Sequence, residues 1–94
     1  MTLKTTKPRW VVCAAIRNWE GDIICSARHW DNLMRSQVIA SSKSWQTAEQ
    51  GFIDQFCVFM NRQEAMLVAK TAGQTVDIRG CGGDETTLYS EGLY

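Results

Sequence analysis

The stretch Arg28-His29-Trp30-Asp31 holds the only histidine of the chain, directly beside an arginine. It stands where an apolar strand pattern changes to the helical spacing of apolar residues. The first N–H groups of a helix have no partner inside the helix and favour an anion. The junction therefore predicts a small anion-binding site. The structural alternative is that Trp30 belongs to the core, Asp31 caps the helix, and Arg28 and His29 are solvated.

The residue types give little support to catalysis. A hydrolase needs a nucleophile, a base and an orienting group, and the chain offers His29 with Asp31 two residues away. No serine or cysteine stands in a recognisable nucleophile motif. The glycine-rich residues 80–83 lack the lysine and the following helix of a phosphate-binding loop. We therefore expect no catalytic residue and no enzyme activity.

The cysteines predict free thiols in a reducing compartment. Cys13, Cys25, Cys57 and Cys81 have no CxxC spacing, and three of the four lie inside apolar runs, which is typical of buried free cysteines. We expect no metal and no cofactor. The start of the chain lacks the apolar stretch of a signal peptide, and no run approaches the roughly 20 apolar residues of a membrane span. These features predict a cytoplasmic protein with no membrane partner.

Charge and aromatic content favour a small anionic ligand over a long polyanion. Ten basic and ten acidic residues cancel, so duplex nucleic acid is not an expected partner. Arginine binds a phosphate with two parallel hydrogen bonds, and an aromatic ring stacks on a base. Residues of both kinds are spread along the chain: Arg28, Arg35, Arg62, Arg79, Trp30, Phe52, Phe56 and Tyr89. The alternative is that the phenylalanines are core residues and the arginines lie at the surface.

The N-terminal half predicts a hairpin and a helix. Residues 1–8 are polar and predict a loose arm. Residues 10–16 are continuously apolar and predict a central strand covered on both faces, paired antiparallel with residues 23–27. A helix is expected over residues 31–40, followed by a polar connector over residues 45–50.

The second half predicts one well-marked helix and a tail. The period of residues 51–60 fits a strand or a helix. Asn61 and Glu64 have the spacing of a capping box and Gly73 that of a helix end, which predicts a helix over residues 62–72. Residues 75–78 predict a short strand and residues 80–87 a flexible link. Residues 88–94 are apolar for a terminus and predict a tail that docks on another surface.

Together these elements predict a single α+β domain over residues 1–94. Its small antiparallel sheet contains the N-terminal hairpin and further short strands, and it packs with two helices. A chain of this length buries a modest core, so we also expect an oligomer.

Five motifs in the same order carry a resemblance to a known family. They are Ala27-Arg28-His29-Trp30-Asp31-Asn32-Leu33-Met34, Glu49-Gln50-Gly51-Phe52-Ile53-Asp54-Gln55, Asn61-Arg62-Gln63-Glu64-Ala65, Ala72-Gly73-Gln74 and Leu88-Tyr89-Ser90-Glu91. With them the chain resembles the phage-encoded Thoeris anti-defence sponge family, first type, over residues 12–94.

The resemblance implies a small α+β protein that sequesters a cyclic ADP-ribose isomer made by a bacterial immune TIR enzyme, and that catalyses nothing. Members of this family are dimers or trimers of dimers, so a homodimer or a hexamer is expected. Some hexamers also hold cyclic oligonucleotides at a second site. Two alternatives are a protein-interaction module that blocks an immune enzyme directly, and an enzyme that cleaves the signal.

The resemblance also implies residues of the pocket. Arg28 and Met34 match the strand-to-helix residues that line it, while Phe52, Asn61, Arg62 and Arg79 are candidates by residue type. If Arg28 closes the strand, its guanidinium meets a ligand phosphate beside the N-terminus of the first helix. Gly92 departs from the acidic residue that the family pattern has after Ser90-Glu91.

Overall fold

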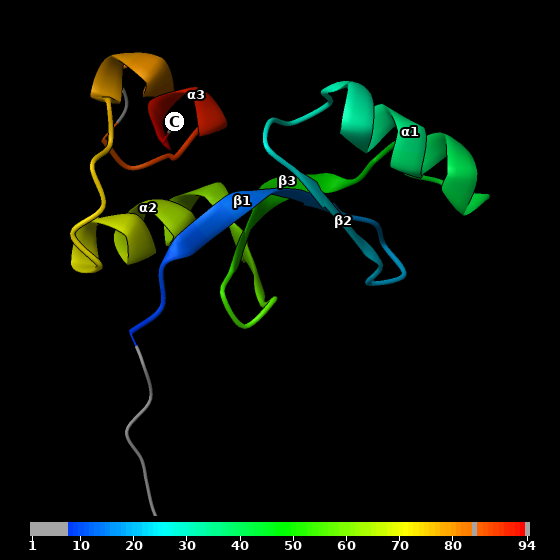
Figure 1. Cartoon of the computed structure of the whole chain (residues 1–94), viewed down its shortest axis with the longest axis horizontal. Coiled ribbons are helices and arrows are strands. Elements are labelled where there is room, and N and C mark those ends of the chain that lie inside the picture. The colour runs from blue at the N-terminus through cyan, green and yellow to red at the C-terminus, as the bar shows by residue number, and fades with distance from the viewer. Residues whose placement is uncertain (1–7, 84, 94) are drawn as a thin grey trace, which may run out of the picture.

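The computed structural model describes residues 8–83 and 85–93. Within them lies an antiparallel sheet of four strands, in the order β2-β1-β3-β4, with three helices (Figure 1). The elements are β1 (Val11–Arg17), β2 (Ile23–Ser26), α1 (Asn32–Ser41), β3 (Glu49–Asp54), β4 (Phe59–Asn61), α2 (Arg62–Thr71), the short 3₁₀ helix η1 (Ile78–Cys81) and α3 (Ser90–Leu93). The α+β class with a small antiparallel sheet is confirmed. Residues 1–7 of the predicted arm, 84 of the link and 94 of the tail lie outside the described residues.

The predicted hairpin is confirmed, with β1 as an interior strand between β2 and β3. Its loop is organised by the buried Asn18, whose side-chain oxygen accepts the backbone N–H groups of Glu20 at 3.1 Å and Asp22 at 2.8 Å. The prediction that β1 is covered on both faces is wrong for Val12, which is exposed. A register shift between Val11 and Cys13 interrupts the alternation of side chains between the two faces of the sheet, and the Val12 side chain is left exposed.

The two longer helices pack on the same face of the sheet. Ala14 and Ile16 are two residues apart on β1, so their side chains point to one face. Ala14 lies in a core with Ala65 and Ala69 of α2, whereas Ile16 lies in a second core with Met34 of α1. Figure 1 accordingly has α2 at one end of the sheet and α1 at the other.

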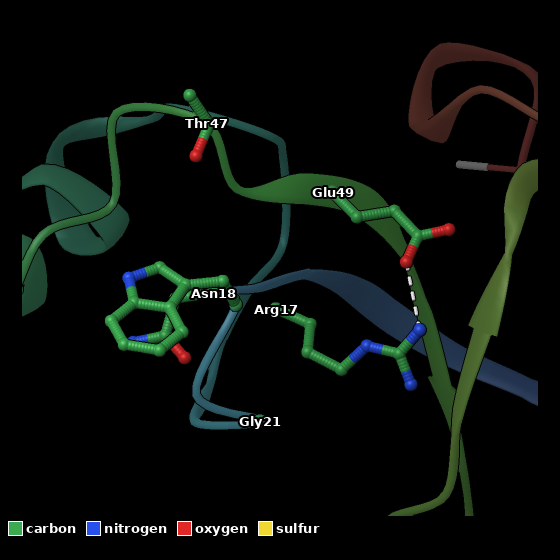
Figure 2. Close-up of a pocket in the computed structure, with 6 residues that line it drawn as sticks. Arg17, Asn18, Gly21, Thr47 and Glu49 are labelled. Atoms are coloured by element: carbon green, nitrogen blue, oxygen red, sulfur yellow. Dashed lines mark hydrogen bonds and ion pairs between the residues drawn. The ribbon is translucent and has the colours of Figure 1, made fainter.

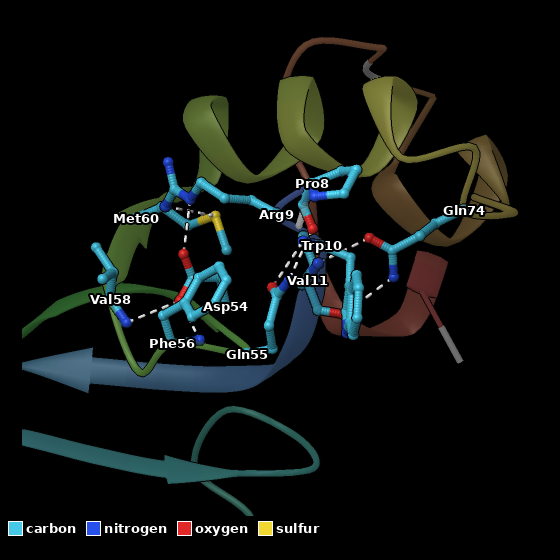
Figure 3. Close-up of polar contacts among 10 residues, drawn as sticks. All are labelled: Pro8, Arg9, Trp10, Val11, Asp54, Gln55, Phe56, Val58, Met60 and Gln74. Carbon is cyan, nitrogen blue, oxygen red and sulfur yellow. Dashed lines mark hydrogen bonds and ion pairs between the residues drawn. The ribbon is translucent and has the colours of Figure 1, made fainter. Parts of the chain in front are cut away.

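The ambiguous segment 51–60 forms parts of two strands joined by a tight turn at Asp54. This buried carboxylate accepts the backbone N–H groups of Phe56 at 2.8 Å and Val58 at 2.9 Å, and the Nε–H of Arg9 at 2.6 Å (Figure 3). Burial raises the pKa of Asp54, but these hydrogen bonds outweigh it, so the pKa lies below its usual value. The Asp54 carboxylate therefore stabilises the turn between β3 and β4. Phe56 lies in this turn and is exposed.

The predicted polar connector over residues 45–50 differs from the structure at both ends. Trp45 is buried in the α1 core, and its indole N–H donates to Ser41 Oγ at 2.7 Å. Glu49 already belongs to β3. The aromatic ring anchors the return of the chain from α1 to the sheet.

The capping box of α2 is confirmed. The Asn61 side chain accepts from the N–H of Glu64, and the Glu64 carboxylate accepts from the N–H of Asn61. The alanine face of this helix is buried against the chain's own sheet. Leu67 points the other way and is 67% exposed.

The strand predicted over residues 75–78 is absent from the sheet. The N–H of Asp77 instead donates to the Gly92 carbonyl oxygen at 2.7 Å, and η1 begins at the next residue. Leu88 is fully buried in the α2 core, with Tyr89 and Leu93 packed against it. The tail thus docks on its own chain, where η1 and α3 lie beside α2 (Figure 1).

All four cysteines are free, as predicted. Their expected burial is found only at Cys81, because Cys57 is exposed in the β3–β4 turn and Cys13 and Cys25 are half-buried. Burial, aided by the nearby Cys25, raises the pKa of Cys13 to about 12. Among residues 8–83 and 85–93, no three His, Cys, Asp or Glu side chains are grouped so that they could hold a metal ion. No helix in this part of the chain has the length and apolar character needed to span a membrane.

Candidate ligand-binding site

Segments far apart in the sequence meet near the N-terminus of α2. The junction between β2 and α1, the first half of β3, the first residue of α2 and the tail each contribute polar or aromatic side chains. We call this group the arginine cluster: Arg28, His29, Gln50, Arg62, Tyr89 and Ser90. It includes Arg28 and Arg62, two of the arginines that the sequence indicates as candidates for binding an anion.

His29 connects the sheet to α2. Its Nε2 lies 2.7 Å from the Gly51 carbonyl oxygen, which can only accept, so Nε2 carries the proton. The Nδ1 lone pair is left to accept from Arg62 Nη2 at 3.5 Å. The ring also meets the Phe52 ring edge-on, with centroids 5.2 Å apart. Both imidazole nitrogens are therefore engaged in structural contacts.

Arg62 is the centre of the cluster. The capping box places it at the first position of α2, from where Nη2 donates to Gln50 Oε1 at 2.9 Å. Its guanidinium carbon lies 4.6 Å from the centroid of the Tyr89 ring, a cation–π contact. Its Nε is buried without a hydrogen-bond partner among the described residues. Burial lowers the pKa of Arg62, yet the guanidinium stays charged near neutral pH.

Arg28 joins the junction to the tail. Its Nη1 donates to the Ser90 carbonyl oxygen at 2.9 Å, so the guanidinium reaches the first residue of α3. The start of α1 is capped by Asp31, which accepts the N–H of Met34 at 2.9 Å. Ser90 itself is fully buried, and its Oγ has no partner among the described residues. The cluster thus holds two guanidinium groups and two buried polar atoms without partners.

The electrostatics favour an anion. Within the described residues, the partners of the Arg62 guanidinium are an amide oxygen, a neutral imidazole and an aromatic ring, and no carboxylate forms an ion pair with it. Glu91 is the carboxylate whose charge acts on His29 and Arg62, but its side chain is exposed and solvated. A phosphate at this place would meet donors whose charge is only partly compensated.

The pKa of His29 predicts a pH-dependent stability. Burial is the largest cause that lowers it below 6.5, and the positive charge of Arg62 adds to this effect. The unfolded chain therefore binds a proton more readily than the folded chain as the pH falls below about 6.5. We expect the free energy of unfolding to be constant from pH 8 to about 6.5 and to decrease below that value, before the carboxylates titrate.

Replacing His29 with Gln tests this expectation, because the amide can still donate to Gly51. The free energy of unfolding of His29→Gln, measured with urea, should stay constant over the pH range in which the parent chain loses stability. An equal slope in both chains would assign the pH dependence to other groups.

Three of the six candidate residues from the sequence come together here. Arg28 and Arg62 belong to the arginine cluster, and Phe52 is fully buried beneath it against His29. Asn61 precedes Arg62, but its side-chain oxygen is occupied by the capping box.

The other two candidates lie elsewhere. Met34 is fully buried in the α1 core, where its sulfur accepts the N–H of Trp30 at 3.1 Å. The side chain of Arg79 is 94% exposed on η1, 3.5 Å from Asp77 Oδ1. We therefore leave both residues out of the proposed site.

Gln50 and Ser90 belong to the cluster although the sequence did not indicate them, whereas His29 stands at the predicted junction and Tyr89 is one of the aromatic residues named above. Two features of the sequence bear on the position of the site. The capping box fixes the orientation of Arg62, and the apolar tail carries Tyr89 and Ser90 to whichever surface it docks on. The sequence did not predict which surface the tail contacts.

A hollow of about 410 Å³ lies at the loop of the β1–β2 hairpin. It is lined by Arg17, Asn18, Trp19, Gly21, Thr47 and Glu49 (Figure 2). Arg17 is already paired with Glu49 at 2.7 Å and lies 4.4 Å from the Phe59 ring centroid. The positive charge of Arg17 is therefore neutralised, whereas among the described residues no carboxylate forms an ion pair with Arg62.

Comparisons with known proteins place the chain in one family. A family model described as phage T4 y16D protein matches residues 10–94. No curated protein and no solved structure matches the chain. Because the family match includes every described element, the chain belongs to the phage T4 y16D protein family and is a phage protein.

Proposed function

We propose that this phage protein is a non-catalytic sponge that binds a cyclic ADP-ribose isomer at the arginine cluster and so blocks bacterial immune signalling. The observation that carries the proposal is that two buried polar atoms of the arginine cluster, Arg62 Nε and Ser90 Oγ, have no hydrogen-bond partner among the described residues. Buried donors are almost always paired in folded proteins. A ligand oxygen would supply the missing partner.

The chemistry of the cluster suits a cyclic nucleotide of this kind, which carries a pyrophosphate and a base. A pyrophosphate carries acceptor oxygens that an arginine can bind through Nε and one Nη at once. The Tyr89 ring offers an aromatic surface to a base, with Arg62 on one side of it. The ligand would then be held by charge and by stacking in the same small volume.

Binding without turnover is consistent with the state of His29. The imidazole is neutral, and its two nitrogens face Gly51 and Arg62, so it is not positioned as a free base. A sponge needs only a dissociation constant below that of the effector that reads the signal. The proposed place of action is the host cytoplasm, where the signal is made.

The resemblance to the sponge family extends the proposal to assembly and to a second ligand. By that resemblance the particle is a homodimer or a trimer of dimers. A second site for cyclic oligonucleotides is proposed on the same ground.

Calorimetry and ligand recovery together test the proposal. The purified chain is titrated with a cyclic ADP-ribose isomer, the complex is heated until the protein denatures, and the released ligand is identified by mass. Tight binding followed by return of the intact ligand is expected. No heat of binding would refute the sponge, and a cleaved product would identify an enzyme. Co-purification of an immune enzyme with the ligand-free chain would favour a direct protein inhibitor.

A further inference from the structure

The hollow at the loop of the β1–β2 hairpin is lined by the most exposed tryptophan of the chain. Trp19 is 79% exposed, whereas Trp30 and Trp45 pack in the α1 core. The volume of the hollow, about 410 Å³, lies within the usual range of about 300–1,000 Å³ for small-molecule sites. An aromatic ring that lines a hollow of this size offers a flat apolar surface to a ligand.

The loop that carries Trp19 is held by its own hydrogen bonds. The Asn18 N–H donates to the Asp22 carbonyl oxygen at 3.0 Å, and the Gly21 N–H donates to the Asn18 carbonyl oxygen at 3.0 Å. Lys43 Nζ also donates to Asp22 Oδ2 at 2.7 Å and ties the loop to the segment after α1. Trp19 therefore stands on an ordered loop, so little conformational entropy is lost when a ligand stacks on it.

The charges around the hollow are balanced and do not favour an anion. Arg17 is paired with Glu49 at 2.7 Å, and both side chains are nearly half exposed (Figure 2). Lys43 is paired with Asp22, and Glu20 adds an exposed carboxylate to the same loop. Among the described residues that line the hollow, a phosphate would meet no uncompensated cation. The ligand that fits this balance is neutral.

The paired side chains supply hydrogen bonds of both kinds at one place. A guanidinium donates and a carboxylate accepts, and beyond the bond that joins them Arg17 has further N–H groups and Glu49 a second oxygen. Two neighbouring hydroxyl groups of a ligand can then accept from Arg17 and donate to Glu49. The exposed Thr47 lines the same hollow and adds a hydroxyl group that both donates and accepts.

From these features we infer that the hollow binds a neutral sugar in its pyranose form. The axial C–H groups make one face of a pyranose ring apolar, and this face lies on the Trp19 indole. Adjacent ring hydroxyls lie at the Arg17–Glu49 pair. The six described residues that line the hollow include no member of the arginine cluster, so the site is separate from the one proposed for the cyclic ADP-ribose isomer.

Saturation-transfer NMR tests the inference, because it detects binding on the protons of the ligand. Glucose, mannose and galactose are each added to the whole chain, and sorbitol is the matched probe that carries similar hydroxyl groups on an open chain. We expect at least one hexose to bind with a dissociation constant of roughly 1–10 mM, as for a ligand of about a dozen non-hydrogen atoms. Saturation should be strongest at the C–H groups of one ring face, and sorbitol should show none.

Three variants locate the site. Trp19→Ala should abolish saturation of the hexose while the chain stays folded, because the ring is exposed. Trp10→Ala is the matched control, since Trp10 is also an exposed tryptophan but precedes β1, at the opposite end of that strand; it should bind the hexose like the parent chain. Glu49→Gln should weaken binding several-fold, because the amide accepts through one oxygen and no longer holds Arg17 by charge.

Four results would overturn the inference. The first is that none of the three hexoses shows saturation, and the second is that the sugar binds Trp19→Ala as well as it binds the parent chain. Displacement of the sugar by inorganic phosphate would identify an anion site instead. Saturation of adenosine in place of the hexoses would identify a nucleoside site.

Discussion

Replacing Arg62 with Met should weaken ligand binding by tens-fold to thousands-fold while the chain remains folded. The guanidinium contacts Gln50 of the sheet, His29 of the β2–α1 junction and Tyr89 of the tail. Losing a charge-assisted contact at a desolvated site costs about 2–5 kcal/mol, which corresponds to that range of affinity. Titration calorimetry with a cyclic ADP-ribose isomer measures the effect.

Arg62→Lys distinguishes the shape of the group from its charge. Lysine keeps the positive charge but has neither the Nε donor nor the planar fork, and it cannot stack on Tyr89 in the same way. We expect most of the affinity to be lost with lysine as well. Full affinity in Arg62→Lys would mean that only a diffuse positive charge is needed.

Arg79→Ala is the matched control. Its side chain is 94% exposed, and it was an equal candidate when only the sequence was considered. We expect its affinity and stability to stay within about ±0.5 kcal/mol of the parent chain. A loss of ligand affinity as large as that of Arg62→Met would indicate that the ligand binds near η1 and not at the arginine cluster.

The sequence predicted those elements whose signals are local. The capping box at Asn61 and Glu64 fixes the start of α2 because both partners lie within one helical turn. The hairpin was predictable for the same reason. Segment 51–60 was ambiguous because its fold depends on Asp54, a buried charge that binds two backbone N–H groups and the distant Arg9. No periodicity in apolar residues reports such a turn.

The candidate site was predictable only in part, since its geometry depends on contacts across the whole chain. The residue types at Arg28 and Arg62 suggested an anion, but His29 links to Arg62 across 33 positions and Arg28 reaches Ser90 across 62. The Arg28–Ser90 contact exists because the tail docks on its own chain, beside η1. The sequence indicated that the tail would dock, but it did not indicate where. The tail packs on η1 because the backbones approach closely at Gly80 and Gly92, where there is no space for a Cβ atom.

Gly92→Ala should destabilise the chain by about 3 kcal/mol and displace α3 from the cluster. A Cβ at this position would collide with the Cys81 sulfur and lie 2.7 Å from the Asp77 carbonyl oxygen. Inserting a methyl group into a packed site typically costs about 1–3 kcal/mol, and backbone atoms on one side place this case at the upper end.

Two measurements on Gly92→Ala separate a local from a global effect. Urea unfolding reports the stability, and amide hydrogen exchange at Asp77 reports the tail, because that N–H donates to the Gly92 carbonyl oxygen. We expect faster exchange at Asp77 and weaker ligand binding, since Tyr89 and Ser90 move with α3. Glu91→Ala, at an exposed neighbouring position, should leave the stability and the exchange at Asp77 unchanged. Unchanged exchange in Gly92→Ala would contradict the close packing of α3 on η1, and with it the contribution of the tail to the site.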